Sequence, residues 1–253
     1  MITVYYRKVF PLEEENTFVE SLLKKTDKRR LEKFYQTKNK NVQMRHLSAG
    51  CLLHEALCEN LGISSECAPA FDIRCMEGGK PYLAGKEDVH FNISHSGDYV
   101  CVAVGDAPVG VDIQEKLAGR RVLCTGNAGQ AFVSCEREQK IAKRFFSSAD
   151  KAKLSLCGEA EYRDLFFRMW SIKESYIKLT GEGMNRGLSG FEIDWQEHKI
   201  WERESGRFTA AFWESEEIPG YSLCVCAYLP KQSASVTETS SHIIWKKMPY
   251  LAC

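Results

Sequence analysis

The spacing of apolar residues predicts a long helix with one buried face between residues 160 and 179. Apolar side chains recur there every three or four positions, which is the repeat of one helix face. They are Tyr162, Leu165, Phe166, Met169, Trp170, Ile172, Tyr176 and Leu179. Glu174 and Lys178 stand four residues apart beside this face, so their side chains leave the helix in the same direction. For this helix alone, a surface ion pair worth about 0.2–0.5 kcal/mol is the commoner explanation of the two charges.

Shorter patterns of the same kind divide the rest of the chain into two similar series. We expect an N-terminal half, residues 1–105, with a strand, helices and a hairpin, and a C-terminal half, residues 106–230, with helices and a meander of strands. Residues 115–134 show no clear period and are expected to be a mobile connection. Residues 231–253 begin with a polar stretch, and we expect a loosely attached tail.

The composition argues against several classes of function. The chain has 253 residues and balances 34 Lys and Arg against 34 Asp and Glu, so no overall charge indicates binding to nucleic acid or to a membrane. No apolar run approaches the roughly 20 residues of a membrane helix, and the first residues lack the layout of a signal peptide. The 11 cysteines form no CxxC and mostly stand in apolar runs, which favours reduced, packed thiols over disulfides or zinc. We therefore expect a cytoplasmic protein.

Local charge is less uniform than the total. Between Lys24 and Arg45 nine basic residues stand against two acidic ones, which indicates either a solvated helix face or a surface that attracts phosphate. The next polar features are a turn lysine, Lys80, and the segment HFNISHSG, in which Ser94 and His95 lie close to a small-residue turn. Hydroxyl and imidazole groups suit a phosphate oxygen, although a lone histidine is more often structural.

A second acidic group changes the interpretation of the long helix. Asp112 lies in GVDIQ, a strand-like segment, and residue 114 points to the same face as residue 112 because side chains alternate along a strand. Carboxylates from two separate elements can bind one hard cation such as Mg²⁺. Asp112 and Glu174 are therefore the candidate metal ligands.

Four segments together resemble the surfactin-type 4′-phosphopantetheinyl transferase family. They are GGKPYL, HFNISHSGDYVCVAVGDAPVGVDIQ, IAKRFF and FFRMWSIKESYIKLTGEGM, which follow the family's order over about residues 79–184. The resemblance implies an α+β pseudo-dimer of two similar halves, each a helix packed on a small antiparallel sheet. It also implies a monomer that binds coenzyme A and Mg²⁺ in the cleft between the halves. The implied reaction moves 4′-phosphopantetheine from coenzyme A to a serine of an apo acyl or peptidyl carrier protein and releases adenosine 3′,5′-bisphosphate.

The resemblance also implies roles for single residues. Asp112 and Glu174 would bind the metal, and Lys178 would stabilise the leaving phosphate. The positions that resemble the family's nucleotide-binding residues are Lys28, Arg30, Arg45, Lys80, Ser94, His95 and Lys178. Catalytic roles are implied for Glu174, Lys178 and Asp150, the last at a place proposed for the general base.

Two departures from the family pattern leave alternatives open. Gln114 replaces a carboxylate at the third metal position, and Asp150 replaces a glutamate, so metal affinity and serine deprotonation are in question. One alternative is a non-catalytic coenzyme A-binding protein with a degenerate site. Another is a different Mg²⁺-dependent phosphoryl enzyme. Retention of Asp112, Glu174 and Lys178 together favours the transferase, but the sequence does not name the carrier protein or its pathway.

Overall fold

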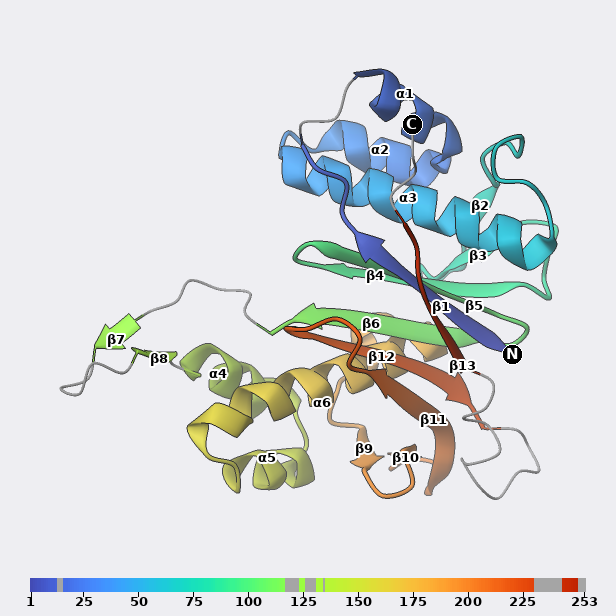
Figure 1. Cartoon of the computed structure of the whole chain (residues 1–253). Coiled ribbons are helices and arrows are strands. Elements are labelled where there is room, and N and C mark those ends of the chain that lie inside the picture. The colour runs from blue at the N-terminus through green and yellow to red at the C-terminus, as the bar shows by residue number, and fades with distance from the viewer. Residues whose placement is uncertain (13–15, 117–122, 126–130, 134, 230–242, 250–253) are drawn as a thin grey trace.

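The computed structural model has two larger, antiparallel-rich sheets, each covered by a long helix (Figure 1). It describes residues 1–12, 16–116, 123–125, 131–133, 135–229 and 243–249. The helices are α1 Asn16–Lys25, α2 Lys28–Gln36, α3 Lys40–Leu61, α4 Glu136–Phe145, α5 Ser148–Ser155, α6 Glu159–Thr180 and the short 3₁₀ helix η1 Gly183–Arg186. The strands are β1 Ile2–Lys8, β2 Ile73–Cys75, β3 Pro81–Leu83, β4 His90–Ser96, β5 Tyr99–Gly105, β6 Val109–Glu115, β7 Leu123–Thr125, β8 Ala131–Val133, β9 Phe191–Asp194, β10 Lys199–Glu202, β11 Arg207–Ser215, β12 Tyr221–Tyr228 and β13 Ile243–Lys247.

The first sheet has the strand order β13-β1-β5-β4, and α3 packs against it. The α3 helix begins where the Asn39 side chain accepts a hydrogen bond from the Val42 amide, and it ends at Gly62, whose φ is 67°. Its buried face meets alternate residues of β5 in one core, which includes Leu53, Leu57, Val100 and Val102. The small β2–β3 hairpin lies beside this core.

The second sheet has the order β6-β12-β11-β10-β9 and is covered by α6. The predicted apolar face of this helix is confirmed, because Met169, Ile172 and Tyr176 are at most 1 % exposed and pack in one core with the sheet. Both halves therefore place a helix on a small sheet, and the predicted α+β class is confirmed. No helix in the described part of the chain is long and apolar enough to span a membrane.

The two sheets meet through side chains of β4 rather than through a continuous backbone ladder. Asn92 accepts a hydrogen bond from the Val111 amide, Ser94 from Ile113 and Ser96 from Glu115. Alternate β4 residues thus satisfy the amides along the β6 edge, which would otherwise be buried without partners. Ser94 and Asp112 lie on strands that belong to different sheets: β4 pairs with β5, and β6 pairs with β12.

The prediction that residues 231–253 form a loosely attached tail was wrong for part of this segment. Residues 231–242 lie outside the described residues, but β13 pairs in parallel with β1 and so belongs to the first sheet. Ile243 and Trp245 pack against the core that the two sheets share. This core holds Ile2 and Val4 of β1 together with Val111 and other residues of β6 and β12. Burial of these side chains is what attaches a segment that looks polar at its start.

The predicted mobile connection, residues 115–134, lies largely outside the described residues. The described parts form the end of β6 and two short strands, β7 and β8, which pair antiparallel. Three-residue strands are not predicted from the sequence, because they are too short for the alternation of apolar and polar residues to become visible.

Gly110 sets the distance between β6 and α6, which gives the first prediction. A Cβ at this position would overlap the Ser175 backbone oxygen and the Leu179 backbone nitrogen. Neither atom can turn aside as a side chain could, so we expect Gly110→Ala to lower the free energy of unfolding by about 1–3 kcal/mol. Urea denaturation measures this change. Gly190→Ala is the matched control, because an added Cβ there would come no closer than 3.7 Å to another atom and, as at Gly110, φ lies outside the left-handed region.

Candidate functional site

Asp112 of β6 is the centre of a polar cluster between the two halves. Its side chain is 1 % exposed. Oδ1 accepts hydrogen bonds from the Ser94 hydroxyl at 2.8 Å and from Lys178 Nζ at 2.6 Å. Oδ2 accepts one from Gln114 Nε2 at 2.8 Å. The cluster therefore joins β4, β6 and α6 and brings Asp112 and Lys178 together.

Glu174 lies one helical turn before Lys178 and faces the same cluster. Burial, and next the negative charge of Asp112, raise the pKa of the Glu174 carboxyl, while Lys178 opposes the shift. Glu174 forms no hydrogen bond or ion pair with another residue in the described part of the chain. Two carboxylates and one ammonium leave a net negative charge, and hard anionic oxygens are what Mg²⁺ prefers. The donor set fits such an ion, although no group of three or more Asp, Glu, His or Cys gathers among the described residues.

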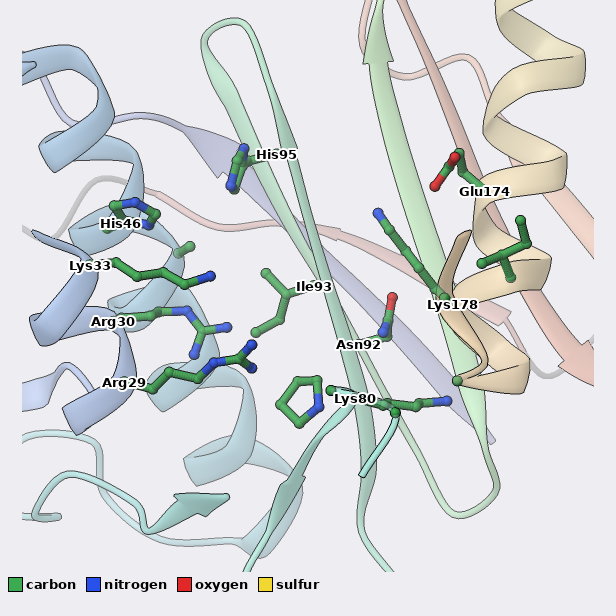
Figure 2. A pocket seen from close by; sticks show the side chains of 17 residues that line it. Arg29, Arg30, Lys33, His46, Lys80, Asn92, Ile93, His95, Glu174 and Lys178 are labelled. Atoms are coloured by element: carbon green, nitrogen blue, oxygen red, sulfur yellow. The ribbon is translucent and has the colours of Figure 1, made fainter. Parts of the chain in front are cut away.

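Beside this cluster lies a cavity of about 330 Å³ whose far wall is basic (Figure 2). Arg29, Arg30 and Lys33 of α2 project into it from one side, and Glu174 and Lys178 of α6 stand on the other. The remaining lining residues are His46, Ala49, Gly78, Gly79, Lys80, Pro81, Asn92, Ile93, His95, Ile177, Gly181 and Gly183. Such a wall attracts an anionic ligand.

The positive charges on this wall act on each other. Burial, followed by Arg29 and Arg30, lowers the pKa of Lys33. Burial, followed by Lys33, Arg30 and Arg45, lowers the pKa of His46. Both shifts show that holding several positive charges in a partly buried space is unfavourable. A bound anion would reduce the repulsion between them.

The structure places only some of the predicted nucleotide-binding residues in the cavity. Arg30, Lys80, His95 and Lys178 line it. Three others are placed differently: Lys28 is exposed outside it, Arg45 donates to the Gly97 carbonyl, and Ser94 directs its hydroxyl to Asp112. Arg29, Lys33 and His46 were missed. The signal for the first two was present, because residues 29, 30 and 33 share one face of a helix.

Lys80 bridges the halves rather than pointing at the basic wall. Its Nζ donates to the Leu179 carbonyl at 2.8 Å, at the end of α6, and to the Val109 carbonyl at 3.2 Å. Burial lowers the pKa of Lys80 to about 8. The turn before it also touches α6, since a Cβ on Gly78 would overlap the Gly181 carbonyl oxygen. The side chain of Lys80 therefore holds the β2–β3 hairpin against α6.

Asp150 stands apart from the cleft, which argues against its predicted role as general base. It is the third residue of α5, where its carboxylate accepts hydrogen bonds from the Ser147 amide and hydroxyl in a capping box. The same carboxylate pairs with Lys173 Nζ at 2.8 Å, and Lys173 is 0 % exposed. Lys173 also donates to the carbonyls of Leu188 and Phe191. The carboxylate thus serves a structural ion pair.

A second, mostly apolar groove continues along α6 beyond Gln114. Its described lining comprises Gln114, Glu115, Arg137, Glu138, Ile141, Phe166, Phe167 and Trp170. Trp170, Glu174 and Lys178 are spaced by four, so groove, carboxylates and lysine follow one side of the helix in order. The cleft therefore presents an apolar end, an acidic centre and a basic end.

Comparison with known proteins shows which family this chain is similar to. The profile of the 4′-phosphopantetheinyl transferase superfamily matches residues 108–226, and that of the 4′-phosphopantetheinyl transferase N-terminal domain matches residues 8–106. The 4′-phosphopantetheinyl transferase Sfp of Bacillus subtilis is 33% identical over 67% of this chain and 69% of its own length. The transferase ffp of Bacillus subtilis is 30% identical over 91% and 93%, and gsp of Aneurinibacillus migulanus is 30% identical over 95% and 90%.

Proposed function

The chain belongs to the 4′-phosphopantetheinyl transferase superfamily, and from its cleft we propose how it carries out the reaction. It transfers 4′-phosphopantetheine from coenzyme A to a carrier protein. The observation that carries the proposal is the order of groups along α6, where a basic cavity, a lysine with two carboxylates and an apolar groove follow one another. This order suits a nucleotide at one end and an acceptor protein at the other.

The reaction joins the serine oxygen of the carrier to the β-phosphorus of coenzyme A and breaks the bridging P–O bond of the pyrophosphate. We propose that Asp112 and Glu174 hold Mg²⁺, which would neutralise charge on the phosphate oxygens when bound. Lys178 provides a positive charge beside the leaving adenosine 3′,5′-bisphosphate. We assign the serine proton to Glu174, because its carboxylate forms no hydrogen bond or ion pair with the described residues.

Intact-protein mass spectrometry tests the reaction directly. The protein is incubated with coenzyme A, Mg²⁺ and a panel of apo acyl and peptidyl carrier proteins. A mass gain of one phosphopantetheine on a carrier, lost when its acceptor serine is replaced by alanine, supports the transferase. Binding of coenzyme A with no mass gain on any carrier would support the non-catalytic alternative, for which we find no supporting observation.

We propose that the 3′-phosphate of coenzyme A lies against the basic wall, and Arg29 provides the test. Contacts between a charged side chain and phosphate are worth about 1.5–3 kcal/mol each, so Arg29→Gln should weaken coenzyme A binding by roughly 10- to 150-fold. Dephospho-coenzyme A should lose far less. Lys28→Gln is the matched control, because this neighbouring cation lies outside the cavity. Equal losses for both ligands would place the phosphate elsewhere.

Gln114 is proposed as a weak or water-mediated metal ligand. A neutral amide attracts Mg²⁺ less than a carboxylate does. We expect Gln114→Glu to lower the Mg²⁺ concentration at half-maximal rate and Gln114→Ala to change it only modestly, while Asp112→Asn is far worse. Titration of Mg²⁺ against transfer rate compares the three variants. If Gln114→Ala were as damaging as Asp112→Asn, the amide would be an essential ligand or substrate contact.

We further propose a monomer that works in the cytoplasm. Both halves of one chain supply the cleft, since Arg29 and His95 come from the first and Glu174 from the second. Nine of the 11 cysteines are free thiols in the described part of the chain, which agrees with a reducing compartment.

A further inference from the structure

The turn between β4 and β5 is held by both halves of the chain. The hairpin that it closes passes between the basic wall and α6 (Figure 2). From the first half, Arg45 Nε of α3 donates to the Gly97 carbonyl at 3.1 Å. From the second half, the Tyr221 hydroxyl of β12 accepts a hydrogen bond from the Asp98 amide at 3.0 Å and donates to Glu115 Oε1 at 3.3 Å. One hydroxyl group therefore joins the turn to β6.

Gly97 shows how closely the turn approaches Tyr221. Its φ is 52°, a conformation that glycine adopts at no steric cost. A Cβ at this position would lie 2.5 Å from the Tyr221 hydroxyl oxygen and 2.7 Å from the Glu115 carboxylate, so no larger residue fits without a shift of its neighbours. The ring of Tyr221 also meets the edge of Tyr99, the first residue of β5, with the centroids 4.9 Å apart. The turn and the tyrosine are thus packed directly against each other.

The end of β4 next to this turn carries a hydroxyl of the polar cluster. Because β4 meets β6 through side chains rather than through a backbone ladder, few groups hold the strand end, and Ser96 makes the last of these links, to the Glu115 amide at 3.0 Å. Ser94 stands two residues earlier, and its Oγ lies 2.8 Å from Asp112 Oδ1 and 2.8 Å from Lys178 Nζ. A shift of the strand end would therefore move the Ser94 hydroxyl away from both groups.

We propose that Tyr221 is a positioning residue for the transfer reaction. Its side chain lies outside the lining of the basic cavity, so it acts through the turn. By holding the turn on β6, it keeps Ser94 in the place where the serine hydroxyl orients Asp112 and Lys178. The proposal rests on the proposed function, because it takes Asp112 and Lys178 as groups that act on coenzyme A.

Tyr221→Phe tests the proposal, because it removes only the hydroxyl group. We expect kcat, measured at saturating coenzyme A, Mg²⁺ and carrier protein, to fall by about two- to tenfold, which is the effect of losing one ordinary hydrogen bond. The affinity for adenosine 3′,5′-bisphosphate should be unchanged, because the basic wall is intact. A merely structural role would not separate these two quantities.

Tyr5→Phe is the matched control. The Tyr5 hydroxyl also donates to a glutamate, Glu59 Oε1 at 3.1 Å, but it lies in the first half and outside both the cavity and the apolar groove. This variant loses a hydrogen bond of the same kind, so its stability in urea should fall by a similar amount. We expect its kcat to remain that of the wild-type protein.

Hydrogen exchange followed by mass spectrometry tests the hold on the turn without any carrier protein. Exchange in peptides that cover residues 94–98 should be faster in Tyr221→Phe than in the wild-type protein, because the turn opens more often. In Tyr5→Phe these peptides should exchange at the wild-type rate.

The outcomes separate this proposal from the transferase function. An unchanged kcat in Tyr221→Phe, or equal losses in Tyr221→Phe and Tyr5→Phe, overturns the proposal while transfer by the wild-type protein still supports the function. Unchanged exchange over residues 94–98 overturns it as well. Faster exchange in Tyr221→Phe, together with a wild-type protein that transfers to no carrier, supports the hold of Tyr221 on the turn and overturns the proposed function.

Discussion

Replacing Glu174 with alanine should abolish phosphopantetheine transfer while leaving the fold intact. The carboxylate makes no hydrogen bond to the described residues and sits beside Asp112, whose charge raises its pKa, so its removal relieves repulsion rather than breaking a support. Losing a metal ligand removes several kcal/mol of transition-state stabilisation. At about 1.4 kcal/mol per factor of ten, we expect a fall of at least about a hundredfold in transfer rate.

The rate is measured by the mass gain of a carrier protein, with urea denaturation as the check on folding. Glu161→Gln is the matched control, because it removes an exposed carboxylate from the same helix. Glu174→Gln should be nearly as inactive as Glu174→Ala, since an amide neither attracts the cation as strongly nor accepts the serine proton. Full transfer activity in Glu174→Ala would contradict both the metal site and the proton acceptor.

Replacing Lys173 with methionine should destabilise the protein by roughly 3–5 kcal/mol, because it leaves the buried Asp150 carboxylate without its partner. Burial lowers the pKa of Lys173, while Asp150 opposes the shift. The ammonium also lies over the Phe191 ring, 4.5 Å from its centroid, so little water can replace it. Urea denaturation gives the change in the free energy of unfolding. A stability of about 5–15 kcal/mol is typical of a domain, so the loss is a large fraction of the total.

The double variant Asp150→Asn with Lys173→Met distinguishes a structural role of Asp150 from a role as general base. Both charges are then absent, so much of the lost stability should return, and transfer should continue because neither residue lines the cleft. A double variant that regains stability but transfers nothing would restore Asp150 as the general base, as the sequence alone had suggested.

The sequence by itself predicted the local elements and the candidate reacting groups. The helix from 159 to 180 follows from a repeat of three and four, which is a property of the helix itself. The placement of Glu174 and Lys178 on one side of this helix follows from the same geometry. The motif series placed Asp112, Glu174 and Lys178 in one family pattern. The structure brings Asp112 and Lys178 within 2.6 Å.

Which surfaces meet was decided only by the tertiary structure. The sequence showed that the segment around α2 is basic. The packing of α2 on α3 places Arg29 and Lys33 in the cavity and leaves Lys28 outside it. The chain between residues 46 and 95 carries no pattern that announces the contact of His46 with His95. The position of Asp150 in the sequence implied a catalytic role, but in the structure its carboxylate forms an ion pair with Lys173. Periodicity reports the direction of a side chain relative to its own backbone, whereas these contacts depend on packing between distant segments, which local geometry does not encode.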